Sequence, residues 1–281
     1  MATPEMKRPG IPSNEIARAP KIGDLPNKPL VEAIFELRWD IVKGSAAPEP
    51  EGWSSVAFKF FSKVQHRYPE PIDLPGAQIP ESMSGYVIRN QFRAAKGKWP
   101  LTQLGPGILS VNETRGYQTW REFQALIAEA VKALIESHDS PIRPTRIELR
   151  YVNSVPFKNE GVPSPEYLKR FLHTTVDTPL EIFADQLVDK NAIAVNANWK
   201  FSLRNPVGYA LLMIANGIDE DGTEAMVWQM AIRSQESDTP QDLKSILSWL
   251  DQSHTSIDRW FVELTEGELL EQFRKAPNGT N

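Results

Sequence analysis

The sequence predicts an α+β fold made of two similar strand–helix–three-strand–helix units with mainly antiparallel sheets, related as a pseudo-twofold duplication. The predicted strands alternate apolar and charged residues and are joined by turns too short for crossover helices. An amphipathic helix with three-four spacing of apolar residues closes each set of three strands. A strand motif also recurs after 112 residues, as residues 35–39 (FELRW) and again as residues 147–151 (IELRY). The repeated motif and the repeated element order together favour a duplication over one continuous α+β domain.

The first unit is expected over residues 25–140, after a tail at residues 1–24. The tail is proline-rich without apolar periodicity, so we expect it to be disordered. In the unit, alternation predicts strands, and the spacing of Val56, Phe60 and Val64 predicts a helix. In chain order, the expected elements are a strand over 31–41, a helix over 54–67, a proline-rich loop, strands over 86–93, 98–104 and 107–113, and a helix over 119–137.

The second unit is expected over residues 141–275, followed by a frayed C-terminus at 276–281. Thr239 and Pro240 resemble a helix start, with a cap residue followed by proline at the first helical position. The expected elements are a strand over 145–155, a helix from Ser164, a short helix over 180–187, strands over 192–204, 207–218 and 225–234, a long helix after Thr239, and a short helix over 266–274.

Composition and charge limit the class of protein. Of 281 residues, 31 are Lys or Arg and 36 are Asp or Glu, so the net charge of −5 argues against binding polyanions over the whole surface. No apolar run approaches the ~18 residues that a membrane span needs. The first residues lack the apolar core of a signal peptide, so we expect no membrane partner and a cytoplasmic protein. Without cysteine, this sequence has no disulfide, thiolate metal ligand or cysteine nucleophile.

Three stretches of the sequence are similar to a known family. They are residues 25–39 (LPNKPLVEAIFELRW), residues 146–153 (RIELRYVN) and residues 261–265 (FVELT). The first resembles the opening signature of the bacterial "sporadically distributed protein" family, L-P-x-x-P-L-x-E-A-x-x-E-L-R. The resemblance implies no catalytic residues, because the family has none assigned. Its patchy distribution is typical of mobile or defence-associated genes, which implies an accessory role in a bacterial defence or stress system.

Motifs that carry catalysis are missing from the sequence. The histidines, His66, His138, His173 and His254, lack the spacing of metal ligands, and His254 lies on the apolar stripe of a helix, as a core or interface histidine does. No glycine-rich phosphate loop and no G-x-S-x-G motif occurs. The sequence therefore predicts no catalytic residue, no metal site and no cofactor, and favours a protein that is not an enzyme.

The charged faces of the two motif strands are the candidate ligand site. Glu36 and Arg38 share one face, as do Glu148 and Arg150. If the two strands lie side by side, we expect Glu36 near Arg150 and Glu148 near Arg38. The favoured interpretation is an ion-pair ladder that joins the two halves. The alternative is the polar floor of a groove in which the arginines hold a small anionic ligand such as a nucleotide.

The last three predicted strands are the candidate partner surface. They carry Met213, Met226 and Trp228, and residues 211–215 are apolar without a break, which predicts burial on both sides. Either the final helices or another chain must cover these residues. We therefore expect a protein partner or a homo-oligomer.

A basic hairpin offers a surface for nucleic acid. Arg89 and Arg93 lie on it together with Tyr86 and Phe92. Tyr86 and Phe92 have the same alternation parity and are expected to face the core, which leaves the arginines on the opposite face. A solvated strand face is therefore favoured over nucleic-acid binding.

Two functions follow from the sequence. The favoured one is a non-enzymatic binding or interaction protein. The alternative is a sensor or enzyme that binds a small anionic ligand in a groove between sheet and helices.

Overall fold

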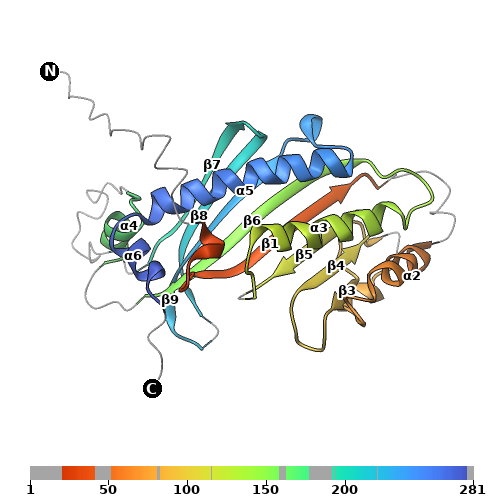
Figure 1. Ribbon diagram of the computed structural model, residues 1–281, viewed down its shortest axis with the longest axis horizontal. Helices are drawn as coiled ribbons and strands as arrows, with labels where there is room; N and C mark the ends of the chain where they lie inside the picture. Colours follow the sequence, from red (N-terminus) through yellow and green to blue (C-terminus); the bar gives the residue numbers. More distant parts are fainter. Residues whose placement is uncertain are drawn as a thin grey trace, which may run out of the picture.

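The computed structural model describes residues 21–41, 52–80, 83–114, 116–157, 163–176, 192, 194–219 and 221–276. In these residues one nine-stranded sheet runs through both predicted units, in the order β2-β3-β4-β5-β1-β6-β9-β8-β7 (Figure 1). The strands are β1 (Leu30–Trp39), β2 (Glu70–Asp73), β3 (Asn90–Arg93), β4 (Leu101–Gly105), β5 (Ile108–Glu113), β6 (Pro144–Pro156), β7 (Asn196–Arg204), β8 (Val207–Ile218) and β9 (Glu224–Ser234). Every neighbouring pair is antiparallel, so the predicted α+β class is confirmed.

Helices pack on one face of this sheet. The described helices are α2 (Gly52–Val64), α3 (Trp120–Ile135), α4 (Ser164–Phe171), α5 (Leu243–Thr265), α6 (Glu268–Arg274) and the short 3-10 helices η1 (Ile22–Asp24), η2 (Pro75–Gln78) and η5 (Glu236–Asp238). Figure 1 shows α3 and α5 side by side across the sheet. Their apolar residues join one core with alternate residues of the central strands, such as Phe35 and Leu149. Among the described residues, no helix is long and apolar enough to cross a membrane.

The pairing of β1 with β6 forms the centre of the sheet. Phe35 lies opposite Leu149 and Leu37 opposite Ile147, with all four side chains buried in the core. The two motif strands therefore lie side by side, and their pairing joins the two halves of the sheet. The opposite face of this pair carries the charged residues of both strands and is called the polar face below.

One segment that was expected to be a loop forms a strand despite its prolines. The segment after α2 was expected to be loop because of its prolines, yet Glu70–Asp73 forms β2 with Pro71 opposite Phe92. The strand β2 lies at the end of the sheet in the described residues. An edge strand tolerates proline because its outer side needs no ladder hydrogen bond.

The start of the long C-terminal helix also differs from the prediction. Asp242, rather than Thr239, caps α5, in a capping box in which the Asp242 side chain accepts a hydrogen bond from the Ser245 amide. The Thr239 hydroxyl instead donates to the carbonyl oxygen of Thr145, at the start of β6. A tertiary hydrogen bond has thus replaced the predicted cap.

The ordered chain begins earlier than predicted. Ile22–Asp24, which fell in the expected disordered tail, forms η1, and the Ile22 side chain is buried in the core. Burial of an apolar side chain offsets the entropy of ordering these residues. Residues 1–20, the predicted helix over 180–187 and residues 277–281 lie outside the described residues.

Candidate functional site: an arginine-rich cleft on the polar face

The register of the central strands places two carboxylates opposite each other. Glu36 of β1 is the direct partner of Glu148 of β6, whereas Arg38 lies opposite Arg146 and Arg150 opposite Ile34. The predicted pairs of Glu36 with Arg150 and of Glu148 with Arg38 are therefore wrong. Because like charges across a strand pair repel, each glutamate requires other cations for neutralisation.

Each glutamate is held by two arginines. Glu36 accepts a hydrogen bond from Nε of Arg38 at 2.8 Å and another from Nη2 of Arg146. Glu148 accepts a hydrogen bond from Arg233 of β9, and Nε of Arg150 lies 3.5 Å from its other oxygen. Two Arg–Glu–Arg triads therefore lie beside each other at the middle of the polar face.

Electrostatics keep the first of these glutamates ionised. Burial acts to raise the pKa of Glu36, but the hydrogen bond and charge of Arg146, together with Arg38, outweigh it and lower the pKa. The carboxylate is thus present at neutral pH and fixes both guanidinium groups. Pre-positioned guanidinium groups lose less conformational freedom when an anion binds.

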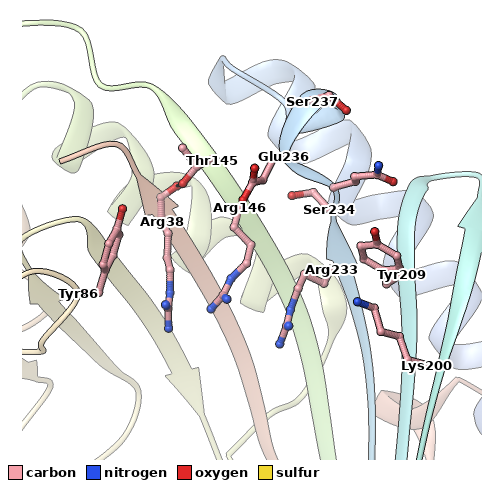
Figure 2. Close-up of a pocket in the computed structure, with 11 residues that line it drawn as sticks. Arg38, Tyr86, Thr145, Arg146, Lys200, Tyr209, Arg233, Ser234, Glu236 and Ser237 are labelled. Atoms are coloured by element: carbon pink, nitrogen blue, oxygen red, sulfur yellow. The ribbon is translucent and has the colours of Figure 1, made fainter. Parts of the chain in front are cut away.

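A cleft of about 610 Å³ opens above the first triad. Its lining residues come from β1, β6, β7, β8, β9 and the loops beside them: Arg38, Tyr86, Thr145, Arg146, Lys200, Tyr209, Arg233, Ser234, Gln235, Glu236 and Ser237. Four of these side chains are basic and only Glu236 is acidic. Figure 2 shows the guanidinium groups of Arg38, Arg146 and Arg233 side by side and extended in the same direction.

Tyrosines lie at both ends of this row of cations (Figure 2). The guanidinium carbon of Arg38 lies 5.5 Å from the ring centroid of Tyr86. The ammonium nitrogen of Lys200 lies 3.8 Å from the ring centroid of Tyr209. Both distances are within the range of cation–π attraction, so each ring supports a cation of the cleft.

The turn between β4 and β5 holds Tyr86 in place. The Tyr86 amide donates to the carbonyl oxygen of Pro106 at 2.7 Å, and Tyr86 has a left-handed φ of 63°. A Cβ on Gly107 would lie 2.8 Å from the Tyr86 ring, and a Cβ on Gly105 would lie 1.9 Å from the Val87 oxygen. Only glycine at both positions allows the segment to approach the turn this closely.

The structure divides the predicted site residues. Arg38 lines the cleft, whereas Arg150 does not. Glu36 and Glu148 do not line it either, but they hold its arginines, Glu36 through Arg38 and Arg146 and Glu148 through Arg233. Tyr86, expected in the core, is 37% exposed because β3 begins only at Asn90, so the predicted alternation does not extend to it.

The predicted partner surface belongs mainly to the core. Trp228 and Met226 are fully buried, and the Trp228 ring stacks on Phe261 of α5. Met213, on the polar face, is half-buried. The long helix α5 therefore covers Trp228, and Trp228 and Met226 are both buried within this chain.

A buried polar network lies on the other side of the sheet. The imidazole of His254 stacks on Trp120, and its Nδ1 lies 3.0 Å from the Tyr151 hydroxyl. Burial lowers the pKa of His254 to about 3 and raises the pKa of Asp258, whose carboxylate oxygen is 3.1 Å away, to about 7. The imidazole is therefore neutral at pH 7. The expectation of a core histidine is confirmed, and the described residues contain no cluster of metal-ligating side chains.

The sequence interpretation missed most of the cleft. Arg146 could have been found, because it has the same parity as Glu148 in β6. Arg233, Tyr209 and Lys200 reach the cleft only through the pairing of β6 with β9, of β9 with β8 and of β8 with β7. No local signal in the sequence specifies that register.

Comparison with known proteins leaves the site without a template. No model of a protein family matches the chain, and no curated protein matches it significantly. The resemblance to the "sporadically distributed protein" family therefore stays a prediction.

Proposed function

We propose that this protein binds a small anionic molecule, bearing phosphate or carboxylate groups, in the arginine-rich cleft. The observation that carries this proposal is the alignment of three guanidinium groups from three neighbouring strands (Figure 2). A cleft of about 610 Å³ is within the usual range of small-molecule sites. The local excess of basic side chains contrasts with the net charge of −5 of the whole chain.

The lining residues favour binding rather than catalysis. Among the described residues, no histidine lines the cleft. The hydroxyl of Ser234 already accepts a hydrogen bond from the Ile147 amide and contacts Thr239. A nucleophile needs an adjacent base, and Ser234 has none within its hydrogen-bond contacts. Ser237 donates to the carboxylate of Asp238, but both residues are exposed on η5. We therefore favour a sensor or carrier of the ligand over an enzyme.

We also propose that the two halves arose by duplication. The antiparallel pairing of β1 with β6 places Glu36 opposite Glu148, and the sequence offset of 112 residues relates the same two residues. A pseudo-twofold axis through this pair would exchange the halves, since β5 flanks β1 as β9 flanks β6. Arg38 and Arg150 are equivalent under this relation. On β5, however, Ser110 takes the position that Arg233 has on β9, so the pseudo-twofold relation does not repeat the row of arginines.

The equivalence of Arg38 and Arg150 provides a matched pair of variants for the test. Both arginines contact a glutamate of the polar face, but only Arg38 lines the cleft. Pyrophosphate binding should be measured by isothermal titration calorimetry at low salt for wild type, Arg38→Lys and Arg150→Lys. We expect Arg38→Lys to weaken binding about tenfold, because lysine cannot form the planar fork of hydrogen bonds.

Arg150→Lys is expected to leave pyrophosphate affinity within about twofold of wild type, at the same cost in stability as Arg38→Lys. Equal loss in both variants would show that the arginines act only through the fold. No pyrophosphate binding to the wild type at millimolar concentration would reject the proposed function.

A protein partner is the second candidate, supported by an exposed apolar side chain on β7, which lies at the edge of the sheet in the described residues. Phe201 of this strand is 53% exposed. An apolar side chain at a sheet edge favours association with another chain. Light scattering of wild type and Phe201→Ser tests this directly, since an assembly formed there would dissociate in the variant. A role in a defence or stress system and a cytoplasmic location rest on the sequence alone.

A further inference from the structure

The two tyrosines of the cleft indicate what its ligand carries besides anionic groups. We propose that the ligand is a dinucleotide, with its linking phosphates on Arg38, Arg146 and Arg233 and one base on each of Tyr86 and Tyr209. This inference rests on the proposed function, because it specifies the ligand of the same cleft.

The two tyrosine rings are too far apart for one base of the ligand to stack on both. Arg38 on β1 and Tyr209 on β8 are separated by β6 and β9, which is three strand spacings, or about 14 Å. Tyr86 contacts Arg38 at the end of the row away from Tyr209 (Figure 2). A single base therefore reaches only one of the tyrosines.

Both rings are held in position before a ligand binds. The turn at Gly107 packs against the Tyr86 ring, and Lys200 lies over the Tyr209 ring. Aromatic side chains held in this way act as stacking platforms for bases, whose faces are attracted regardless of base identity. Tyr86 has a left-handed backbone conformation, which is strained for a residue with a bulky side chain. Strain of this kind is concentrated at functional sites.

The cations between the rings suit phosphates. Arg38, Arg146 and Arg233 come from adjacent strands, so their guanidinium groups follow one another across the sheet. A lone carboxylate occupies a single guanidinium fork, whereas linked phosphates present oxygens along the whole row. The cleft of about 610 Å³ has the size of a small-molecule site, which argues against a nucleic-acid strand as the ligand.

The test compares ligands that share phosphates but differ in bases. Calorimetric titrations would use pyrophosphate, ADP, diadenosine triphosphate, diguanosine triphosphate and a single-stranded oligonucleotide on the full chain at one salt concentration. We expect at least one dinucleotide to bind about tenfold tighter than ADP, and ADP tighter than pyrophosphate, because each stacked base adds to affinity.

Variants of the two tyrosines test the stacking. Tyr86→Asn removes the ring but tolerates a left-handed backbone, and Tyr209→Thr keeps a strand-forming residue in β8. We expect each to weaken dinucleotide binding about 5- to 100-fold. Pyrophosphate binding should weaken by a much smaller factor, because each ring also supports one cation of the cleft. Tyr86→Phe and Tyr209→Phe keep the rings and are expected to bind within about twofold of wild type. Phe58→Ser, at an exposed aromatic residue of α2, is the control.

The outcomes separate this inference from the proposed function. If pyrophosphate binds but the dinucleotides bind no tighter than ADP, or the tyrosine variants bind like wild type, the dinucleotide inference is wrong and the anion site stands. Tighter binding of the oligonucleotide than of any dinucleotide also overturns the inference. If none of the five probes binds, both proposals are wrong.

Discussion

Replacing Glu36 by glutamine should change stability and anion affinity in opposite directions. Glu36 holds Arg38 and Arg146 at the cleft, but its negative charge also opposes the anion that these arginines would bind. Glu36→Gln preserves the shape of the side chain and removes its charge. If the carboxylate is only a structural partner of the arginines, both stability and affinity should fall together.

The cost in stability follows from burial. The Glu36 side chain is 15% exposed and the side chains of Arg38 and Arg146 are 31% and 26% exposed. Breaking a fully buried pair costs about 3–5 kcal/mol and an exposed pair about 0–1 kcal/mol, so we expect a loss of about 1–3 kcal/mol. Because the pKa of Glu36 is lowered in the fold, its contribution is present above the unfolded pKa and is lost as the pH falls through the folded pKa. The two proteins should therefore converge in stability at acidic pH.

The gain in affinity follows from Coulomb's law. A carboxylate and an anion on opposite edges of one guanidinium group lie about 6–7 Å apart, which gives a repulsion of about 0.6–1.4 kcal/mol per unit of anion charge at an effective dielectric constant of about 40–80. Its removal should tighten pyrophosphate binding about three- to tenfold. Raising the salt concentration should reduce this gain.

Urea denaturation and calorimetric titration of pyrophosphate measure the two effects. Glu129→Gln is the control, since Glu129 pairs with Arg67 and His66 and does not line the cleft. It should lose a similar or smaller amount of stability and leave the affinity unchanged. Weaker pyrophosphate binding by Glu36→Gln would refute the reasoning, because it would mean that the carboxylate is needed to position the arginines.

The remaining predictions concern the core and the turn between β4 and β5. Burial raises the pKa of Asp258 to about 7, so the contribution of its protonated form to stability is present at low pH and is lost as the pH rises towards 7. Between pH 5 and pH 8, the free energy of unfolding of Asp258→Asn should therefore rise by about 2–3 kcal/mol relative to that of the wild type. Urea denaturation at several pH values measures this difference. Gly107→Ala should lose about 1–2 kcal/mol more than Gly97→Ala in thermal denaturation, since both have positive φ but only the first would contact Tyr86. Trp228→Ala should cost about 3–5 kcal/mol of folding free energy, whereas a residue kept for a partner would cost little.

The fold followed from the sequence where local patterns determine structure. Alternation in the motif strands predicted the bounds of β1 and β6 to within two residues. The short connections between β7, β8 and β9 correctly predicted that these strands are antiparallel neighbours. The prediction failed where tertiary contacts override local preference. Thr239 bonds to β6 rather than capping a helix, and Pro71 is accommodated in an edge strand.

Only a small part of the candidate site could be predicted, for a similar reason. Glu36 and Arg38 were found because neighbouring residues of one strand necessarily share a face. Their partners were not found, since the register of β1 against β6 decides whether Glu36 meets Arg146 or Arg150. A shift of register by two residues would have preserved the buried pattern and exchanged the charged partners, so burial alone cannot specify the ion pairs.

The most direct test of the anion site is a crystal structure of the protein with sodium tungstate, a strongly scattering analogue of phosphate. The account predicts an anomalous difference peak in the cleft, within hydrogen-bond distance of guanidinium nitrogens of Arg146 and at least one of Arg38 and Arg233. Tungstate bound elsewhere on the protein, with the cleft empty at a concentration that saturates other basic sites, would contradict it.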